Sequence, residues 1–161
     1  MNPNVDNARP RVLVADPDPE TSALLARQLD WSGYDVTTAA NGREALDLIT
    51  RLRPAAAVLE VTMELLNGYE VVRQLREDPR SGKLPVVMIS ARAGKLDRDF
   101  AFTVGADDYV KKPFHSSELV ARLALLVPTA ETLKAATEKL KPQPAPRPMR
   151  RRPAPMPAFA R

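Results

Sequence analysis

The sequence of 161 residues contains no cysteine and only one histidine, His115. Without cysteine, the chain cannot form a disulfide, a thiolate zinc site, an iron–sulfur cluster or a cysteine nucleophile. A single histidine excludes a multi-histidine metal site and argues against a histidine-dependent catalytic triad. The chain also lacks the run of roughly 20 apolar residues that a membrane-spanning helix needs, and it has no apolar signal stretch at its start. We therefore expect a cytoplasmic protein without a membrane span.

Positive charge is concentrated near the C-terminus. The formal net charge is +4, yet residues 134–161 hold eight Lys and Arg against one acid, Glu138. Seven of the 16 prolines lie in residues 142–161. Because proline lacks an amide donor and has a fixed φ, this segment is predicted to be a disordered, Pro/Arg-rich tail. Its arginines could bind nucleic acid or another acidic surface, or the tail could have no partner; they are Arg147, Arg150, Arg151 and Arg152.

Apolar runs of strand length alternate with amphipathic stretches through residues 10–127, and 44% of the chain is hydrophobic. The expected strands are 12–15, 34–38, 55–59, 85–89 and 109–111. A helical pattern follows each run, including 95–104 with Phe100 and Val104 facing inward. Five such units with short right-handed connections predict an α/β fold. The expected architecture is a flavodoxin-like doubly wound parallel sheet of order 2-1-3-4-5 with five helices.

The expected domain organisation is an N-terminal arm (1–9), a body (10–127), a helical extension (128–141) and the tail (142–161). Apolar residues keep helical spacing from Leu119 to Leu140 across Pro128, which favours one kinked helix. This helix either folds back on its own domain or pairs with another protein. No separate output domain is expected to fit after residue 127.

Polar residues follow four of the predicted strands. In a doubly wound sheet the carboxyl ends of the strands form the ligand site. The residues expected at this edge are Asp16, Asp18, Glu60, Ser90 and Lys112. They combine carboxylates, a hydroxyl and an amine, but no glycine-rich phosphate loop accompanies them.

Four motifs carry a resemblance to a known family: VLVADPDPE, RPAAAVLEVTMELLNGYEV, LPVVMISA and GADDYVKKPF. Together they resemble the receiver domain of bacterial two-component response regulators, over about Arg11 to Val127. The resemblance implies transfer of a phosphoryl group to an aspartate after the third strand. It also implies Mg²⁺ held by that aspartate, by an acidic pair after the first strand and by a backbone carbonyl.

Matched to those motifs, the phosphoacceptor position holds Glu60. Asp16 is the first member of the acidic pair, but Pro17 occupies the second, and Thr62 supplies the carbonyl position. The resemblance assigns the remaining family positions to Ser90 (hydroxyl), Ala91 (small residue), Tyr109 (switch aromatic) and Lys112 (phosphate-binding lysine).

Two of these positions depart from the family's chemistry. Glu60 extends the carboxylate by about 1.5 Å, and Pro17 offers no side-chain oxygen. We expect no cofactor, or at most weak Mg²⁺ binding through Asp16, Glu60 and Thr62, with Asp18 as a substitute ligand. Glu60 is either a buried carboxylate paired with Lys112 or a permanent imitation of the phosphorylated aspartate.

The sequence thus predicts a non-enzymatic, single-domain pseudo-receiver that works through protein–protein interaction. The expected contact face combines residues 95–104, 109–111 and 116–126, and a homodimer through 116–126 and the extension is a further possibility. Two alternatives remain open. One is a working receiver phosphorylated on Glu60 or Asp16, and the other is a nucleic-acid-binding accessory protein acting through its tail.

Overall fold

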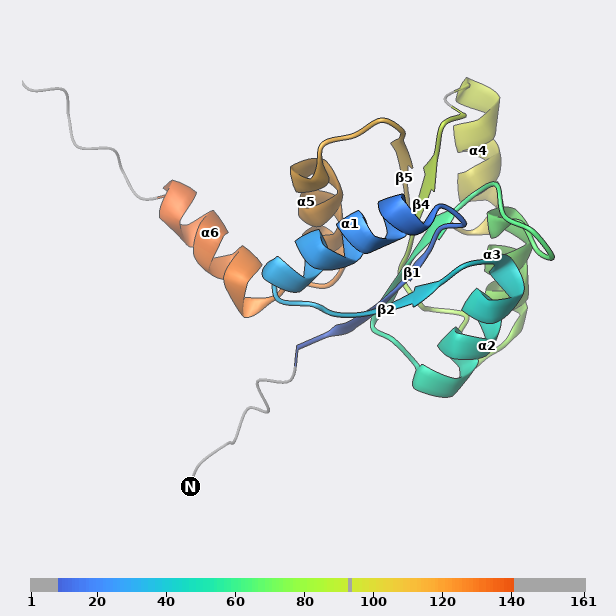
Figure 1. Cartoon of the computed structure of the whole chain (residues 1–161), viewed down its shortest axis with the longest axis horizontal. Helices are drawn as coiled ribbons and strands as arrows, with labels where there is room; N and C mark the ends of the chain where they lie inside the picture. The colour runs from blue at the N-terminus through green and yellow to red at the C-terminus, as the bar shows by residue number, and fades with distance from the viewer. Residues whose placement is uncertain (1–8, 93, 141–161) are drawn as a thin grey trace, which may run out of the picture.

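Five strands alternate with helices in the computed structural model, which describes residues 9–92 and 94–140 (Figure 1). The strands are β1 (Arg11–Ala15), β2 (Asp35–Ala39), β3 (Ala56–Glu60), β4 (Val86–Ser90) and β5 (Asp108–Lys111). The helices are α1 (Pro19–Trp31), α2 (Gly42–Leu52), α3 (Gly68–Glu77), α4 (Lys95–Val104), α5 (Ser116–Leu126) and α6 (Ala130–Leu140). All strand pairs are parallel in the order β2-β1-β3-β4-β5, which confirms the predicted sheet.

Helices cover both faces of this sheet. The helices α1 and α5 pack on one face, and α2, α3 and α4 on the other (Figure 1). Successive residues of a strand point to opposite faces, so each strand feeds two hydrophobic clusters. In β3, Leu59 belongs to the cluster under α2 and α3, whereas Val58 belongs to the cluster under α1 and α5. Burial on both faces explains why the strands are continuous apolar runs.

The helix α3 begins directly behind the end of β3. Asn67 and Glu70 form a capping box, in which each side chain accepts a hydrogen bond from the other residue's backbone N–H. The Gly68 N–H donates to the carbonyl of Val61 at 2.8 Å. A Cβ on Gly68 would lie 2.5 Å from the carbonyl oxygen of Glu60, so this close approach requires glycine.

The helix α4 has only part of the predicted face inward, since Val104 packs against the core cluster under α2 and α3 as expected. Ala101 is fully buried, whereas Phe100 is 51% exposed, so the expectation of an inward Phe100 was wrong. The Phe100 ring instead packs edge-on against Tyr69, with 4.8 Å between centroids. The small Ala101 side chain lets α4 approach the sheet closely, and this approach rotates Phe100 toward solvent.

The predicted single kinked helix is also wrong, because α5 and α6 are separate helices. The helix α5 ends before Val127, whose carbonyl accepts a 2.6 Å hydrogen bond from the Tyr34 hydroxyl. After Pro128, the Thr129 hydroxyl donates to the carbonyl of Ser32 at 2.6 Å. These two bonds attach the break to the loop after α1 and fix the direction in which α6 leaves the domain (Figure 1).

Several expectations concern residues outside the described part of the chain. They are the N-terminal arm apart from Arg9, the final residue of the extension, and the tail (142–161). The candidate tail residues Arg147, Arg150, Arg151 and Arg152 lie there too.

Candidate functional site

The carboxyl ends of three strands bring together three of the predicted site residues. Asp16 directly follows β1, Glu60 is the last residue of β3, and Lys112 directly follows β5. The side chains of Asp16 and Glu60 are shielded, with residue exposures of 2% and 6%. Two acids so deeply buried require partners, because an isolated buried carboxylate is costly.

Lys112 pairs with both acids. Its Nζ lies 2.6 Å from Asp16 Oδ2 and 2.6 Å from Glu60 Oε2. Burial alone would lower the pKa of this lysine, but the hydrogen bonds to Asp16 and Glu60, together with their charges, raise it above 10.5. Lys112 therefore stays charged at neutral pH and holds the two carboxylates together.

Backbone amides engage the other carboxylate oxygens. The Thr62 N–H donates to Glu60 Oε1 at 3.1 Å, and the Asp18 N–H donates to Asp16 Oδ1 at 2.9 Å. All four oxygens of Asp16 and Glu60 thus already accept from the protein. The family match assigned the Thr62 carbonyl to a metal, whereas in the structure it is the Thr62 amide that contacts Glu60.

The Asp18 side chain caps the helix α1. As the N-cap, it accepts from the backbone N–H groups of Glu20 and Thr21 at 3.4 Å and 3.1 Å. The Thr21 hydroxyl also donates to it, and this bond is the main reason that the pKa of Asp18 is lowered. The Asp18 carboxylate therefore stabilises a helix end and does not join Asp16 and Glu60.

Ser90 and Tyr109 both lie close to the backbone of Arg92. The buried Ser90 hydroxyl oxygen accepts from the Arg92 N–H at 3.0 Å, and the inward-facing Tyr109 hydroxyl donates to the Arg92 carbonyl at 2.6 Å. Within the described residues, no hydrogen bond joins Ser90 to Glu60. Ala91, which lies between Ser90 and Arg92 in the chain, is exposed. Arg92 could not be predicted as a site residue, because its contribution comes from backbone atoms.

These residues fit a magnesium site poorly. Mg²⁺ requires oxygen ligands at about 2.0–2.1 Å in near-octahedral geometry. Both available carboxylates, Asp16 and Glu60, are bound to Lys112, Asp18 caps α1, and Pro17 has no side-chain oxygen. In the part of the chain that the structure describes, no group of three or more acids or histidines is arranged to hold a metal ion. A cation would have to displace Lys112 to reach these oxygens.

Among the described residues, no helix is both long and apolar enough to cross a bilayer.

Comparison with protein families gives one match over the body of the chain. A model described as the response regulator receiver domain matches residues 12–124. The response regulator MprA of Mycolicibacterium vanbaalenii is 45% identical over 117 residues, which are 73% of this chain and 50% of that protein. The transcriptional regulatory protein PrrA of Mycobacterium tuberculosis is 44% identical over 132 residues, which are 81% of this chain and 56% of that protein. The chain spans about half the length of the curated relatives it matches.

Solved structures have the same fold. The chemotaxis protein CheY4 of Vibrio cholerae superimposes with a TM-score of 0.71 at 28% identity, over 74% of this chain and 100% of that one. The receiver domain of the sensor histidine kinase PA1611 from Pseudomonas aeruginosa PAO1 gives a TM-score of 0.69 at 28% identity, over 74% and 98% of the two chains. That structure has a magnesium ion coordinated in its active-site cleft.

Proposed function

The chain belongs to the response regulator receiver family, and from this membership we propose that it is a pseudo-receiver, a signalling module whose state does not depend on phosphorylation. The observation that carries the proposal is the ion pair between Glu60 Oε2 and Lys112 Nζ at 2.6 Å. It occupies the place where the family's phosphoacceptor and phosphate-binding lysine meet.

The geometry of Glu60 argues against phosphoryl transfer. Its carboxylate extends about 1.5 Å further than that of aspartate, and a misplacement near 1 Å can cost about a hundredfold in rate. One oxygen is bound to Lys112 and the other to the Thr62 amide, so neither is a free nucleophile. With Pro17 in place of a metal ligand, we expect at most weak Mg²⁺ binding.

Glu60 reproduces only part of the phosphorylated state. It engages Lys112 as a phosphoryl group would, but it does not engage Ser90, which accepts from Arg92 instead. A carboxylate also has two oxygens and one charge, whereas a phosphoryl group has three oxygens and nearly two charges. We therefore propose that Glu60 and Asp16 hold Lys112 permanently in an ion pair, in which Ser90 takes no part.

The module is proposed to act by binding a signalling protein rather than as an enzyme. The supporting surface is the face formed by α4, β5 and α5. On α4, Leu96, Phe100 and Phe102 are exposed large apolar side chains. Side chains of this kind are enriched at the buried centres of protein interfaces.

A second copy of the chain is a further proposed partner through α5 and α6. A groove of about 710 Å³ lies between α1, α5 and α6, and Trp31, Leu125 and Leu133 line it with large exposed fractions. Analytical ultracentrifugation of the wild type and Leu133→Glu tests this. A dimer in the wild type that becomes a monomer in the variant supports the proposal, and a wild-type monomer at high concentration contradicts it.

Exposure to acetyl phosphate and Mg²⁺, followed by intact-mass measurement, tests the main proposal. The wild type should gain no phosphoryl group, whereas the double variant Pro17→Asp/Glu60→Asp, which restores the family's residues, should gain one. The single variant Glu60→Asp separates the two causes, since it corrects the nucleophile but not the missing ligand. Stoichiometric, Mg²⁺-dependent phosphate on the wild type would instead favour the working receiver.

A further inference from the structure

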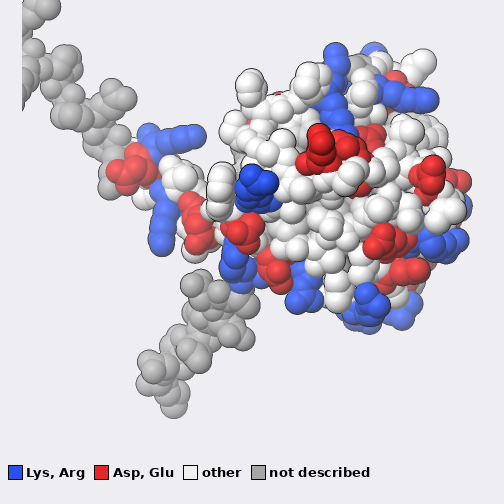
Figure 2. Space-filling view, in the orientation of Figure 1, with Lys and Arg blue, Asp and Glu red and all other residues white. Residues whose placement is uncertain are grey.

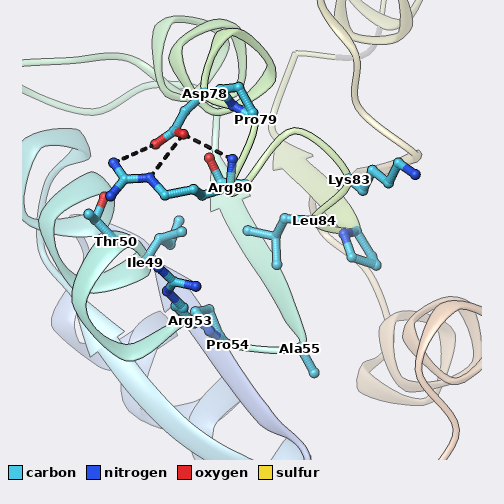
Figure 3. A pocket seen from close by; sticks show the side chains of 12 residues that line it. Ile49, Thr50, Arg53, Pro54, Ala55, Asp78, Pro79, Arg80, Lys83 and Leu84 are labelled. Carbon is cyan, nitrogen blue, oxygen red and sulfur yellow. Dashed lines mark hydrogen bonds and ion pairs between the residues drawn. The ribbon is translucent and has the colours of Figure 1, made fainter.

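A cavity of about 330 Å³ lies at the amino ends of β3 and β4, whereas Glu60 lies at the carboxyl end of β3. Figure 3 shows the residues that line this cavity. It opens where the connection from α2 to β3 passes the connection from α3 to β4. Its volume is at the lower end of the range for small-molecule sites. Neither the matched family positions nor the proposed function uses these residues.

Half of the twelve residues in the walls of the cavity are apolar, and the other half are polar or charged. Ile49 and Leu84 lie at its centre (Figure 3), and the prolines Pro54, Pro79 and Pro85 surround them. Proline has no backbone N–H to donate. A ligand on the apolar half of these walls would therefore gain mainly from burying its own apolar surface.

The one carboxylate in the lining is already neutralised. Asp78 accepts from Arg80 Nε at 3.2 Å, from Arg80 Nη2 at 3.1 Å and from the Arg80 backbone N–H at 3.0 Å (Figure 3). The side-chain bonds from Arg80 are the main reason that the pKa of Asp78 is lowered. This pair adds no net charge to the cavity.

Two further cations, Arg53 and Lys83, leave the lining with a net positive charge. Within residues 9–92 and 94–140, neither side chain forms a hydrogen bond or an ion pair, although the charge of Arg53 helps to lower the pKa of Asp78. Figure 2 shows further Lys and Arg side chains along the lower margin of the domain, around α2. The same view shows Asp and Glu side chains close to them, so the favourable potential for an anion comes from Arg53 and Lys83 in the lining.

The backbone at Arg53 is in a conformation that usually selects glycine. Arg53 ends α2 with φ 47° and ψ 63°, and its N–H donates to the carbonyl of Ile49 at 2.9 Å. Helices often end on such a left-handed residue, which is most commonly glycine because a Cβ is disfavoured there. The chain instead has an arginine at the rim of the cavity. Backbone strain of this kind is concentrated at functional positions.

We propose that this cavity binds a small organic anion with a flat apolar body and an acid group. The body would lie against Leu84 and the prolines of the lining, and Arg53 would hold the acid group, since a guanidinium forms strong charge-assisted hydrogen bonds with carboxylates and phosphates. Lys83, which also lines the cavity, adds to the positive potential there. The proposal is independent of whether Glu60 can be phosphorylated.

The test is a titration of the full ¹⁵N-labelled chain with 1-naphthyl phosphate, followed by NMR. Saturable shifts should be largest for the amides around Arg53 and Leu84. Inorganic phosphate and 1-naphthol should each bind at least about tenfold more weakly, because each supplies only one part of the interaction.

Arg53→Gly is the informative variant, because glycine accepts φ 47° without a side chain and the fold is retained. It should lose about tenfold or more in affinity for 1-naphthyl phosphate while its thermal midpoint is kept or raised. Lys134→Gln, which removes one positive charge from the exposed helix α6, is the matched control and should bind like the wild type. Unchanged affinity in Arg53→Gly, shifts centred elsewhere, or equal binding of inorganic phosphate would each overturn the proposal.

Discussion

Replacement of Lys112 by methionine tests the central feature of the site. The substitution keeps a side chain of similar length but removes the ammonium that lies 2.6 Å from both Asp16 and Glu60. The two carboxylates are 1% and 8% exposed, so water cannot replace the lost partner. Removing one member of a buried ion pair costs about 3–5 kcal/mol. Because the Lys112 side chain is itself 23% exposed, we expect the lower part of that range, about 3 kcal/mol.

The assay is urea unfolding at pH 7 in the presence of EDTA, followed by far-UV circular dichroism. Trp31 is 75% exposed and would report poorly by fluorescence. Lys95→Met is the matched control, since Lys95 pairs with Asp99 at 2.7 Å on the surface. Its loss of stability should be far smaller than that of Lys112→Met, because an exposed ion pair contributes little.

The double variant Lys112→Met/Glu60→Gln separates charge from packing. It should recover part of the stability that Lys112→Met loses, since one uncompensated carboxylate is gone. A loss below about 1 kcal/mol in Lys112→Met, or one equal to that of Lys95→Met, would refute the view that Lys112 holds two buried acids.

Three further predictions concern single side chains. Tyr34→Phe removes the hydrogen bond to the Val127 carbonyl and should cost about 1 kcal/mol at pH 7. Burial raises the pKa of Tyr34 from 10.0 to about 12, so the folded chain keeps a proton that the unfolded chain loses, and wild-type stability should fall as the pH rises through this window. Tyr34 should contribute up to about 2–3 kcal/mol of this fall, so urea titrations of Tyr34→Phe should show an alkaline fall smaller by that amount, whereas an identical alkaline profile would contradict this. Gly68→Ala places a Cβ 2.5 Å from the Glu60 carbonyl oxygen and should cost about 1–3 kcal/mol in urea unfolding; wild-type stability would show that the loop shifts freely. Asp18→Ala removes the N-cap of α1 and should lower the urea midpoint, whereas Asp18→Asn should lower it less in the same assay, and equal losses would argue against capping.

The fold could be predicted because the strands are buried on both faces. A run such as residues 12–15 is apolar at every position, and the polar residues directly after it mark the carboxyl edge of the sheet. Parallel topology then brings Asp16, Glu60 and Lys112 to one edge without further information. The proximity of these three residues could therefore be predicted from the spacing of the strands and the right-handed connections between them.

Helix details were less predictable, because they depend on contacts distant in sequence. The inward face of α4 is decided by the close approach of Ala101, which shifts Phe100 by one position around the helix. The break between α5 and α6 depends on Tyr34 and Ser32, which lie 93 and 97 residues from their partners Val127 and Thr129. Periodicity along one segment contains no information on such bonds.

The pairing of Glu60 with Lys112 was predictable, but most other hydrogen-bond partners within the site were not. An aspartate before a helix serves equally well as an N-cap or as a metal ligand, and only the coordinates assign Asp18 to α1. Ser90 and Tyr109 meet the backbone of Arg92, which any residue type would provide. Arg53 and Lys83 resemble ordinary surface charges until the fold brings their loops to one cavity. The sequence signal for this cavity was that the helix α2 ends on arginine rather than on glycine.

The sheet divides the interior into two compartments that share backbone but no side chains. Consecutive residues of β3, such as Val58 and Leu59, belong to different compartments. Changes of side-chain volume in one compartment reach the other only through displacement of the strands, so substitutions on opposite sides should combine additively in their effects on stability. The compartment beneath α2 and α3 could therefore be remodelled, by selection or by design, without disturbing the packing that supports Glu60 from the side of α1 and α5.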